Sequence, residues 1–212
     1  MLGRPLDSTA VTELIQQAQG GSTESLGKLL DRYRNYLKFL ASSRISALVR
    51  VRAGSSDVVQ EVGLQALKSI GQFRGATEKE FLAWLRSVLA SRLSRLMEQH
   101  VGAERRDVRR ELRVEALAHD LENSTVRLEE LLADRVETPS SKLIKEETIV
   151  VVTDILASLS REYREVICLR HLEGLAFPQV AERLNRSPGA TRMLWFRAIE
   201  LLRNELAEKG FV

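Results

Sequence analysis

Apolar residues recur along most of the chain at intervals of three and four positions, the spacing of one face of an α-helix. The clearest case lies between residues 57 and 73, where one side carries Val59, Val62, Ala66, Ile70 and Phe73. The polar positions of the same segment fall on the other side: Asp57, Gln60, Glu61 and Lys68. This pattern predicts an amphipathic helix with one buried side and one side facing solvent.

The same period continues through the remaining segments. A second apolar stripe contains Phe81, Trp84, Leu85, Val88 and Leu89, and we expect Trp84 to belong to the core. Further helices are predicted over residues 22–45, 160–170, 178–184 and 188–206. No alternating strand pattern of useful length is present, so the predicted fold class is all-α.

Charge is distributed unevenly along the chain. The 212 residues are 44% hydrophobic and 29% charged, with a formal net charge of +3, which permits a nucleic-acid partner without requiring one. Residues 86–113 hold eight arginines and four acids, whereas residues 114–150 hold nine acids and four bases. The stretch ADRVETPSSKL contains Pro139 and two serines and is the best candidate linker. We therefore expect domains at 1–113 and 141–212, joined by an acidic linker over 114–140 with room for a short helix in VEALAHDL or VRLEELLADRV.

The segment EGLAFPQVAERLNRSPGATRMLWFRAIELLR predicts two helices joined by a tight turn. Pro178 suits the first turn of one helix, and Asn185 suits the left-handed conformation that ends it. Ser187 and Pro188 suit the cap and first position of the next helix. With the helix over 160–170, this arrangement describes a helix-turn-helix, whose later helix enters the major groove of DNA.

On that last helix, the positions predicted to face inward are Thr191, Leu194, Trp195 and Ala198. Arg192, Phe196 and Arg197 are predicted to face outward, where an arginine could contact guanine edges or phosphates. The alternative is a three-helix bundle with solvated arginines. A buried position is expected for Cys168, the single cysteine, which lies in an apolar run and excludes an internal disulfide.

The first half offers two further candidate surfaces. Asp57, Gln60 and Glu61 share one helical face that suits a basic partner, although an ordinary solvated face has the same composition. The loop over 73–79 carries Arg74, Gly75 and Lys79 and could hold a nucleotide turned out of its stack. Downstream, Arg92 and Arg95 extend the basic side, although an ordinary solvated helix surface remains an alternative for each of them.

Together these segments resemble a known family. DVVQEVGLQALKSIGQFRG, FLAWLRSVL and LSREYREVICLRHLEGLAFPQVAERLNRSPGATRMLWFRAIELLR are similar, in order and spacing, to the group IV, or extracytoplasmic-function (ECF), sigma factors of bacterial RNA polymerase. The resemblance covers residues 20–110 and 150–207. It implies two helical domains, of the sigma region 2 and region 4 types, and a linker that threads the polymerase cleft.

The resemblance also implies roles for particular residues. Asp57, Gln60 and Glu61 would bind core RNA polymerase. The −10 promoter element would be recognised and opened by the 73–79 loop and the helix after it, with Arg74, Gly75, Lys79, Arg92 and Arg95 as candidates. The −35 element would be read by Ser187, Arg192, Phe196 and Arg197. The run from Met193 to Phe196 is more apolar than the Ser/Arg-rich start that is usual for this helix. Members of the family are often held by an anti-sigma factor, which no residue of this chain identifies.

Two other classes of function remain open at this point. A helix-turn-helix regulator acting without polymerase would use the first half for dimerisation or sensing. An enzyme is disfavoured, because the three histidines are scattered without metal-ligand spacing and no phosphate-binding glycine loop or serine-elbow motif occurs. We therefore expect no catalytic residues, no metal and no cofactor. The chain shows no signal-peptide pattern and no apolar run that could span a membrane, so a cytoplasmic location is expected.

Overall fold

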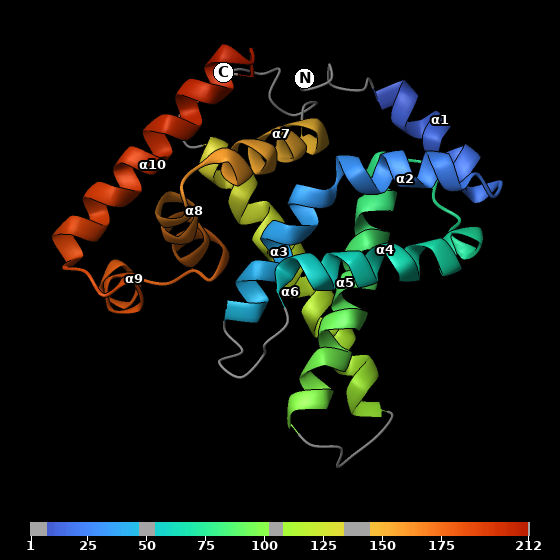
Figure 1. The fold of residues 1–212 in the computed structure, drawn as a ribbon, viewed down its shortest axis with the longest axis horizontal. Helices are drawn as coiled ribbons and strands as arrows, with labels where there is room; N and C mark the ends of the chain where they lie inside the picture. The colour runs from blue at the N-terminus through green and yellow to red at the C-terminus, as the bar shows by residue number, and fades with distance from the viewer. Residues whose placement is uncertain (1–7, 47–53, 102–107, 134–144, 212) are drawn as a thin grey trace. The chain divides into compact units, whose positions relative to one another are not determined.

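The computed structural model describes residues 8–46, 54–101, 108–133 and 145–211 (Figure 1). Throughout these ranges the regular structure is helical, which confirms the predicted all-α class. The elements in chain order are α1 (Ser8–Gln19), α2 (Thr23–Arg32), α3 (Arg34–Ser46), α4 (Ser55–Ser69), η1 (Ile70–Gln72), α5 (Glu78–Val101), α6 (Val108–Ala133), α7 (Lys145–Ser158), α8 (Arg161–Ile167), η3 (Cys168–Leu172), α9 (Phe177–Leu184) and α10 (Pro188–Glu208). No described helix is long and apolar enough to cross a membrane.

The chain divides into two compact units, residues 1–122 and 123–212, and the boundary falls within α6. The predicted division placed the first domain at 1–113 and an acidic linker at 114–140. Residues 114–133 of that linker are part of α6, so both helical segments allowed within it, VEALAHDL and the start of VRLEELLADRV, belong to one helix. The candidate linker ADRVETPSSKL lies, beyond its first residue, outside the described residues.

The core of the first unit forms where α1 packs on α2 and α5, and where α4 packs between α3 and α5. Its largest fully buried side chains include Ile15, Leu29, Leu37, Phe81 and Leu89. On α4 the buried positions are Val58, Val62 and Ala66. The predicted buried stripe was therefore wrong at its first position: Val58 is buried there, whereas the predicted Val59 is only half-buried.

The helix predicted over residues 22–45 is two helices, α2 and α3, separated at Tyr33. The break contains neither glycine nor proline, and the apolar period passes through it, so local sequence gives no sign of it. Tyr33 is completely buried, and its hydroxyl donates a hydrogen bond of 2.6 Å to the Glu78 carboxylate on α5. The break between α2 and α3 therefore coincides with a tertiary contact to α5.

The second unit packs α10 against α7, α8 and α9. Its core contains side chains that are almost wholly buried, among them Val152, Leu156, Ile167, Ala198 and Leu202. The helix predicted over 160–170 begins as expected, with the Ser160 hydroxyl accepting from the Tyr163 N–H, and then continues as the π-helical turn η3. Cys168 is buried within that turn, as predicted.

The turn between α9 and α10 follows the predicted local signals closely. Asn185 adopts φ 56° and ψ 44°, the left-handed conformation, directly after α9. Ser187 caps α10, since its hydroxyl accepts a hydrogen bond of 3.2 Å from the Ala190 N–H. Pro188 is the first residue of α10. These local interactions set the sharp change of direction between the two helices.

We expect the Asn185→Val variant to destabilise the chain by about 1–2 kcal/mol, because a β-branched residue is strained at positive φ. Asn185→Gly is the matched control and should be close to neutral, since glycine adopts this conformation freely. Urea unfolding of the full chain, followed by circular dichroism, measures both. Equal stability of the valine variant and the parent chain would contradict this account of the turn.

Candidate nucleic-acid and partner interfaces

The three residues predicted to meet a basic partner are all exposed on α4. Asp57 has a second, local role: its carboxylate accepts a hydrogen bond of 3.1 Å from the Gly54 N–H at the start of the helix. A carboxylate in the first turn also interacts favourably with the helix dipole. Asp57 therefore supports α4 itself, whereas no such local hydrogen bond is found for Gln60 in the described structure.

Two exposed leucines extend this polar face and were not anticipated. Leu64 is 57% exposed and Leu67 is 48% exposed. Leu64 follows Gln60 by four residues and Glu61 by three, so it lies beside them on the helix surface. We call Asp57, Gln60, Glu61, Leu64 and Leu67 the α4 outer face. The sequence contained a signal for these exposed leucines: both are large apolar residues, yet neither falls on the predicted apolar stripe.

An ion pair joins two residues that were assigned to different interfaces. Glu61, predicted to meet polymerase, pairs with Arg92 of α5, predicted to meet the −10 element. The Arg92 side chain is 17% exposed and that of Glu61 is 46% exposed. Arg92 is thus largely withdrawn from solvent in the free chain, unlike the exposed Arg74, Lys79 and Arg95.

Of the predicted loop over 73–79, residues 73–77 are non-helical, whereas Glu78 and Lys79 form the start of α5. Hydrogen bonds from two side chains hold the non-helical part in place. The Gln19 side chain of α1 donates to the carbonyl oxygens of Gly75 at 2.7 Å and Phe73 at 3.1 Å. The Arg74 guanidinium donates to the Gly71 carbonyl oxygen at 2.6 Å while remaining exposed. The backbone that carries Arg74 is therefore fixed by these hydrogen bonds.

Gly75 is required by close packing within this loop. A Cβ built at this position would lie 2.4 Å from Cζ of Phe73 and 2.7 Å from Cβ of Glu80. The Phe73 ring cannot easily move away, because it packs against Trp84 and Phe81 at centroid distances of 5.2 and 5.8 Å. Trp84 is half-buried in this aromatic cluster, where it supports the loop.

The end of the loop is fixed by a cap on α5. The Glu80 carboxylate accepts hydrogen bonds from the N–H groups of Ala76 and Thr77 and from the Thr77 hydroxyl. These bonds, that from Ala76 foremost, lower the pKa of Glu80 below its ordinary value. Because the folded-state pKa is depressed, this cap stabilises the fold above the unfolded-state pKa, and the contribution is lost as the pH falls through the folded value.

The first residue of α5, Glu78, is a buried polar group directly after the loop. Glu78 is 9% exposed, accepts the Tyr33 hydroxyl and approaches Arg32 to 3.6 Å. Burial, followed by the neighbouring Glu78 carboxylate, raises the pKa of Tyr33, so its hydroxyl remains a proton donor. This network connects the end of α2 to the start of α5, and so fixes the position at which the loop ends.

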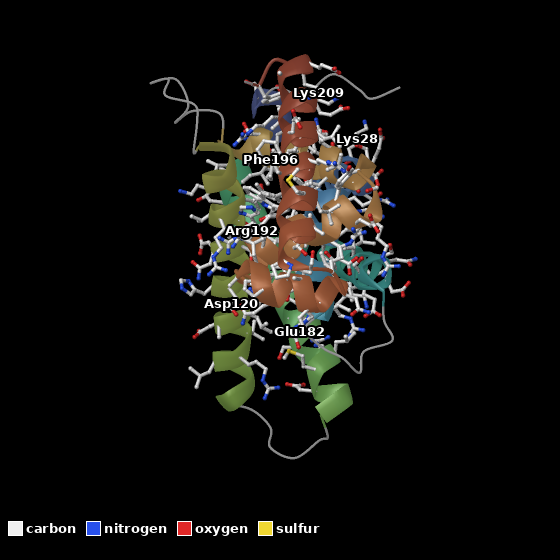
Figure 2. All side chains as sticks on the ribbon, turned by 90° about the vertical axis from the view of Figure 1, so that its left-hand side faces the viewer. Lys28, Asp120, Glu182, Arg192, Phe196 and Lys209 are labelled. Carbon is white, nitrogen blue, oxygen red and sulfur yellow. The ribbon has the colours of Figure 1, made fainter. Side chains whose placement is uncertain are left out.

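The predicted inward and outward sides of α10 are confirmed. Thr191 and Ala198 are fully buried, Leu194 and Trp195 are half-buried, and Arg192, Phe196 and Arg197 are exposed. Figure 2 shows Arg192 and Phe196 following one another along this helix. Ser187 acts through its cap on α10, as described above, and is itself exposed.

Contacts at Trp195 set the rotation of α10 about its axis. Its indole N–H donates a hydrogen bond of 2.9 Å to Nε2 of His171, which must therefore be unprotonated at that nitrogen. The Trp195 ring also meets the edge of Phe177, at the start of α9, with 5.6 Å between centroids. The Arg192 guanidinium lies 5.6 Å from the centre of the Phe177 ring. Met193, 54% exposed, completes the outward side and was not among the predicted residues.

Comparisons with known proteins agree with the resemblance noted in the sequence. A family model described as Sigma-70, region 4 matches residues 149–202. The ECF RNA polymerase sigma-E factor of Haemophilus influenzae is 31% identical over 193 residues, which cover 91% of this chain and 93% of that protein. The ECF RNA polymerase sigma factor BldN of Streptomyces coelicolor is 25% identical, with 92% of this chain and 66% of that protein covered.

A solved structure was also matched. One chain of the RsbN-BldN complex is 21% identical, with 90% of this chain and 97% of that chain covered, at a TM-score of 0.29.

Within the described residues, no group of three or more His, Cys, Asp or Glu side chains is arranged to hold a metal ion.

Proposed function

This chain belongs to the ECF sigma factors of RNA polymerase, and on that premise we propose how its two units carry out the function of such a factor. It binds core RNA polymerase and directs promoter recognition and transcription initiation. The observation that carries the assignment of surfaces is the exposure of most of the predicted contact residues, namely Asp57, Gln60, Glu61, Arg74, Lys79, Arg95, Ser187, Arg192, Phe196 and Arg197. The proposed role places the chain with the cytoplasmic polymerase and requires no catalytic group of its own.

We propose that the α4 outer face is the surface that binds core polymerase. Its carboxylates and amide suit a basic partner surface, and the flanking Leu64 and Leu67 offer apolar area that binding would remove from water. An apolar centre within a polar rim is the usual composition of a protein interface. Because Glu61 is paired with Arg92 in the free chain, a basic group of the polymerase would compete with Arg92 for this carboxylate.

The loop over 73–79 is proposed to meet the −10 element as its strands separate. Arg74, Lys79 and Arg95 are exposed and can contact phosphates, which supply most of the salt-dependent affinity of such complexes. Gly75 gives the loop its shape, and Arg92 becomes available where Glu61 is occupied by polymerase. Gln19, Phe73 and Trp84 hold the loop in one conformation. Little conformational entropy would therefore be lost when the loop binds an extruded nucleotide base.

The first half of α10 is proposed to read the −35 element in the major groove. Arg192 and Arg197 are exposed there, and a good bidentate arginine contact contributes about 1–3 kcal/mol of discrimination between bases. The acidic stretch 114–140 is proposed as the part that meets the positively charged path for nucleic acid on polymerase. An anti-sigma factor is a further proposed partner, by membership of the family.

Gel filtration with core polymerase tests the proposed function directly. The full chain should co-elute with core polymerase, and run-off transcription from a promoter library should begin at specific templates only when the chain is added. The alternative, a regulator that binds an operator without polymerase, predicts no co-elution and a specific complex with free DNA. Failure of both co-elution and stimulated transcription would refute the sigma-factor mechanism proposed here.

Arg192→Ala and Arg197→Ala should each lower −35-dependent transcription about tenfold, consistent with the loss of one base or phosphate contact. Arg203→Ala is the matched control, because Arg203 is also exposed on α10 but lies farther from its N-terminus. Reconstituted run-off transcription measures all three. If both alanine variants initiate like the parent chain, α10 does not enter the groove as assigned.

A further inference from the structure

The outward side of α10 carries apolar side chains where a DNA-reading helix ordinarily carries polar ones. Met193 is 54% exposed and Phe196 is 57% exposed, and they lie between Arg192 and Arg197. We call these four residues the α10 outer patch. Phe196 follows Arg192 by four residues and Met193 by three, and Arg197 follows Met193 by four, so these pairs are neighbours on the helix surface. Exposure of two large apolar side chains within one helical turn is unfavourable in water and suggests a binding role.

The arginines on either side favour DNA over protein as the occupant of this patch. A protein-docking site is commonly a wider apolar area with a polar rim, whereas here two cations flank a narrow apolar strip. The first turn of α10 is also small: Gly189 and Ala190 are exposed, and a Cβ at Gly189 would meet nothing within 4 Å. A slim helix N-terminus permits close approach to the floor of a groove.

The major groove offers one kind of apolar group to such a patch, the C5 methyl group of thymine. The other base edges present hydrogen-bond donors and acceptors, which would lose water against Met193 or Phe196 and gain no partner. The rise of 1.5 Å per residue separates Met193 from Phe196 by about 4.5 Å along the helix. This separation is close to the 3.4 Å step between bases in one strand, so the two side chains can cover adjacent steps.

The rotation of α10 fixes which way these side chains face. Thr191 is buried and its hydroxyl donates to the Ser187 carbonyl oxygen at 3.0 Å, and Trp195 is held by His171. Because Thr191, Trp195 and Ala198 face the unit's own core, Met193 and Phe196 are held on the opposite side. Phe196 has few rotamers to lose on binding, and Met193 can adapt its shape to the base step.

We propose that Met193 and Phe196 determine specificity by contacting thymine methyl groups in the −35 element. The proposal rests on the proposed function, since it requires that α10 enters the major groove of a promoter. Arginines of the patch then position the helix or read guanine, while the apolar pair selects thymine. A promoter preference of this chain thus contains a hydrophobic component that is distinct from its arginine contacts.

Replacement of thymine by deoxyuridine tests the proposal, because deoxyuridine lacks only the methyl group. Preferred promoters are first selected from a randomised library with the holoenzyme formed from core polymerase and the full chain. Each −35 thymine, on either strand, is then replaced singly. Holoenzyme affinity should fall about fourfold for a methyl group in contact with the patch.

The variants Phe196→Ala and Met193→Ala should lower affinity for the thymine promoter by a similar factor. Each should also be insensitive to deoxyuridine at the position that its side chain contacts. Leu201→Ala is the control: Leu201 is 40% exposed on the same helix but farther from its N-terminus, and this variant should respond to deoxyuridine like the parent chain. Circular dichroism checks folding, which exposed positions should not disturb.

Several results would overturn the proposal while leaving the sigma-factor function intact. These are full tolerance of deoxyuridine by the parent holoenzyme, a selected −35 element made only of G·C pairs, and undiminished deoxyuridine sensitivity in both alanine variants. Normal promoter affinity of the variants, together with lost binding of a protein such as an anti-sigma factor, would make the patch a protein-docking site instead. No holoenzyme and no stimulated initiation would instead refute the proposed function, and this inference with it.

Discussion

The Gly75→Ala variant should lose most initiation from double-stranded promoters, by about tenfold or more. The added Cβ would lie 2.4 Å from the Phe73 ring, which Phe81 and Trp84 hold in place, and 2.7 Å from Glu80 Cβ. Overpacking of this kind costs about 1–3 kcal/mol. We expect the strain to shift the loop that Gln19 braces, and with it the cations proposed to meet the separating strands. Run-off transcription and permanganate footprinting measure the loss of opening.

Gly71→Ala is a matched control for this loop. Gly71 lies in η1, four residues before Gly75, is exposed, and has no atom within 4 Å of a Cβ built there. This variant should initiate like the parent chain. A template whose −10 region is already unpaired should restore much of the activity of Gly75→Ala, because strand separation is no longer required and the variant leaves the proposed polymerase contact on α4 unchanged. Normal opening by Gly75→Ala on duplex DNA would show that the loop does not act in strand separation.

Leu64→Arg should weaken association with core polymerase by about thirtyfold, the effect of losing a contact worth roughly 2 kcal/mol at the centre of an interface. Leu64 is 57% exposed beside Gln60 and Glu61, so the fold should tolerate the change. An arginine there would add a positive charge to a face proposed to meet a basic surface, and the apolar contact would be lost. Equilibrium binding of the labelled full chain to core polymerase measures the effect.

Leu112→Arg provides the control for Leu64→Arg. Leu112 is 62% exposed on α6 and lies outside the α4 outer face, so an arginine there changes charge and apolar area equally. Its affinity for core polymerase should stay within about twofold of the parent chain, the size of a surface effect of under 0.5 kcal/mol. Equal affinity of both leucine variants would remove α4 from the proposed polymerase contact.

Substitutions at Glu61 need a different design, because this residue contacts Arg92 as well as its proposed partner. Removal of the carboxylate also releases Arg92, a residue proposed for DNA. Effects at these two positions are therefore not additive, and only a double-mutant cycle separates the polymerase contribution from the internal pair. Leu64 offers a simpler test of the same surface.

The helix-turn-helix could be predicted in detail because its signals are local. Asn185 in the left-handed conformation, Ser187 as a cap and Pro188 at the first position each act within a few residues along the chain. The outward position of Arg192, Phe196 and Arg197 followed from the same helical period that buries Thr191 and Ala198. Helical spacing alone was enough for this surface.

The 73–79 segment and the α4 outer face could be predicted only in part. Arg74 and Lys79 are exposed as predicted, but Lys79 lies in the first turn of α5 and not in the loop. The pairing of Arg92 with Glu61 connects separate helices, α5 and α4. The exposure of Leu64 and the half-burial of Val59 depend on how α4 is rotated against α3 and α5. A shift of one position in the buried stripe cannot be detected from periodicity, because neighbouring valines satisfy either assignment.

From the residues alone follow the all-helical class, the turn between α9 and α10, and the family to which the chain belongs, because each rests on short-range periodicity or on motif spacing. The contact of Tyr33 with α5, the bracing of the 73–75 turn by Gln19, and the withdrawal of Arg92 from solvent depend on folding. Each involves atoms brought together from distant segments: Tyr33 with Glu78, the 73–75 turn with Gln19, and Arg92 with Glu61. Contacts of this kind depend on the packing of whole helices, and no local pattern of residues contains that information.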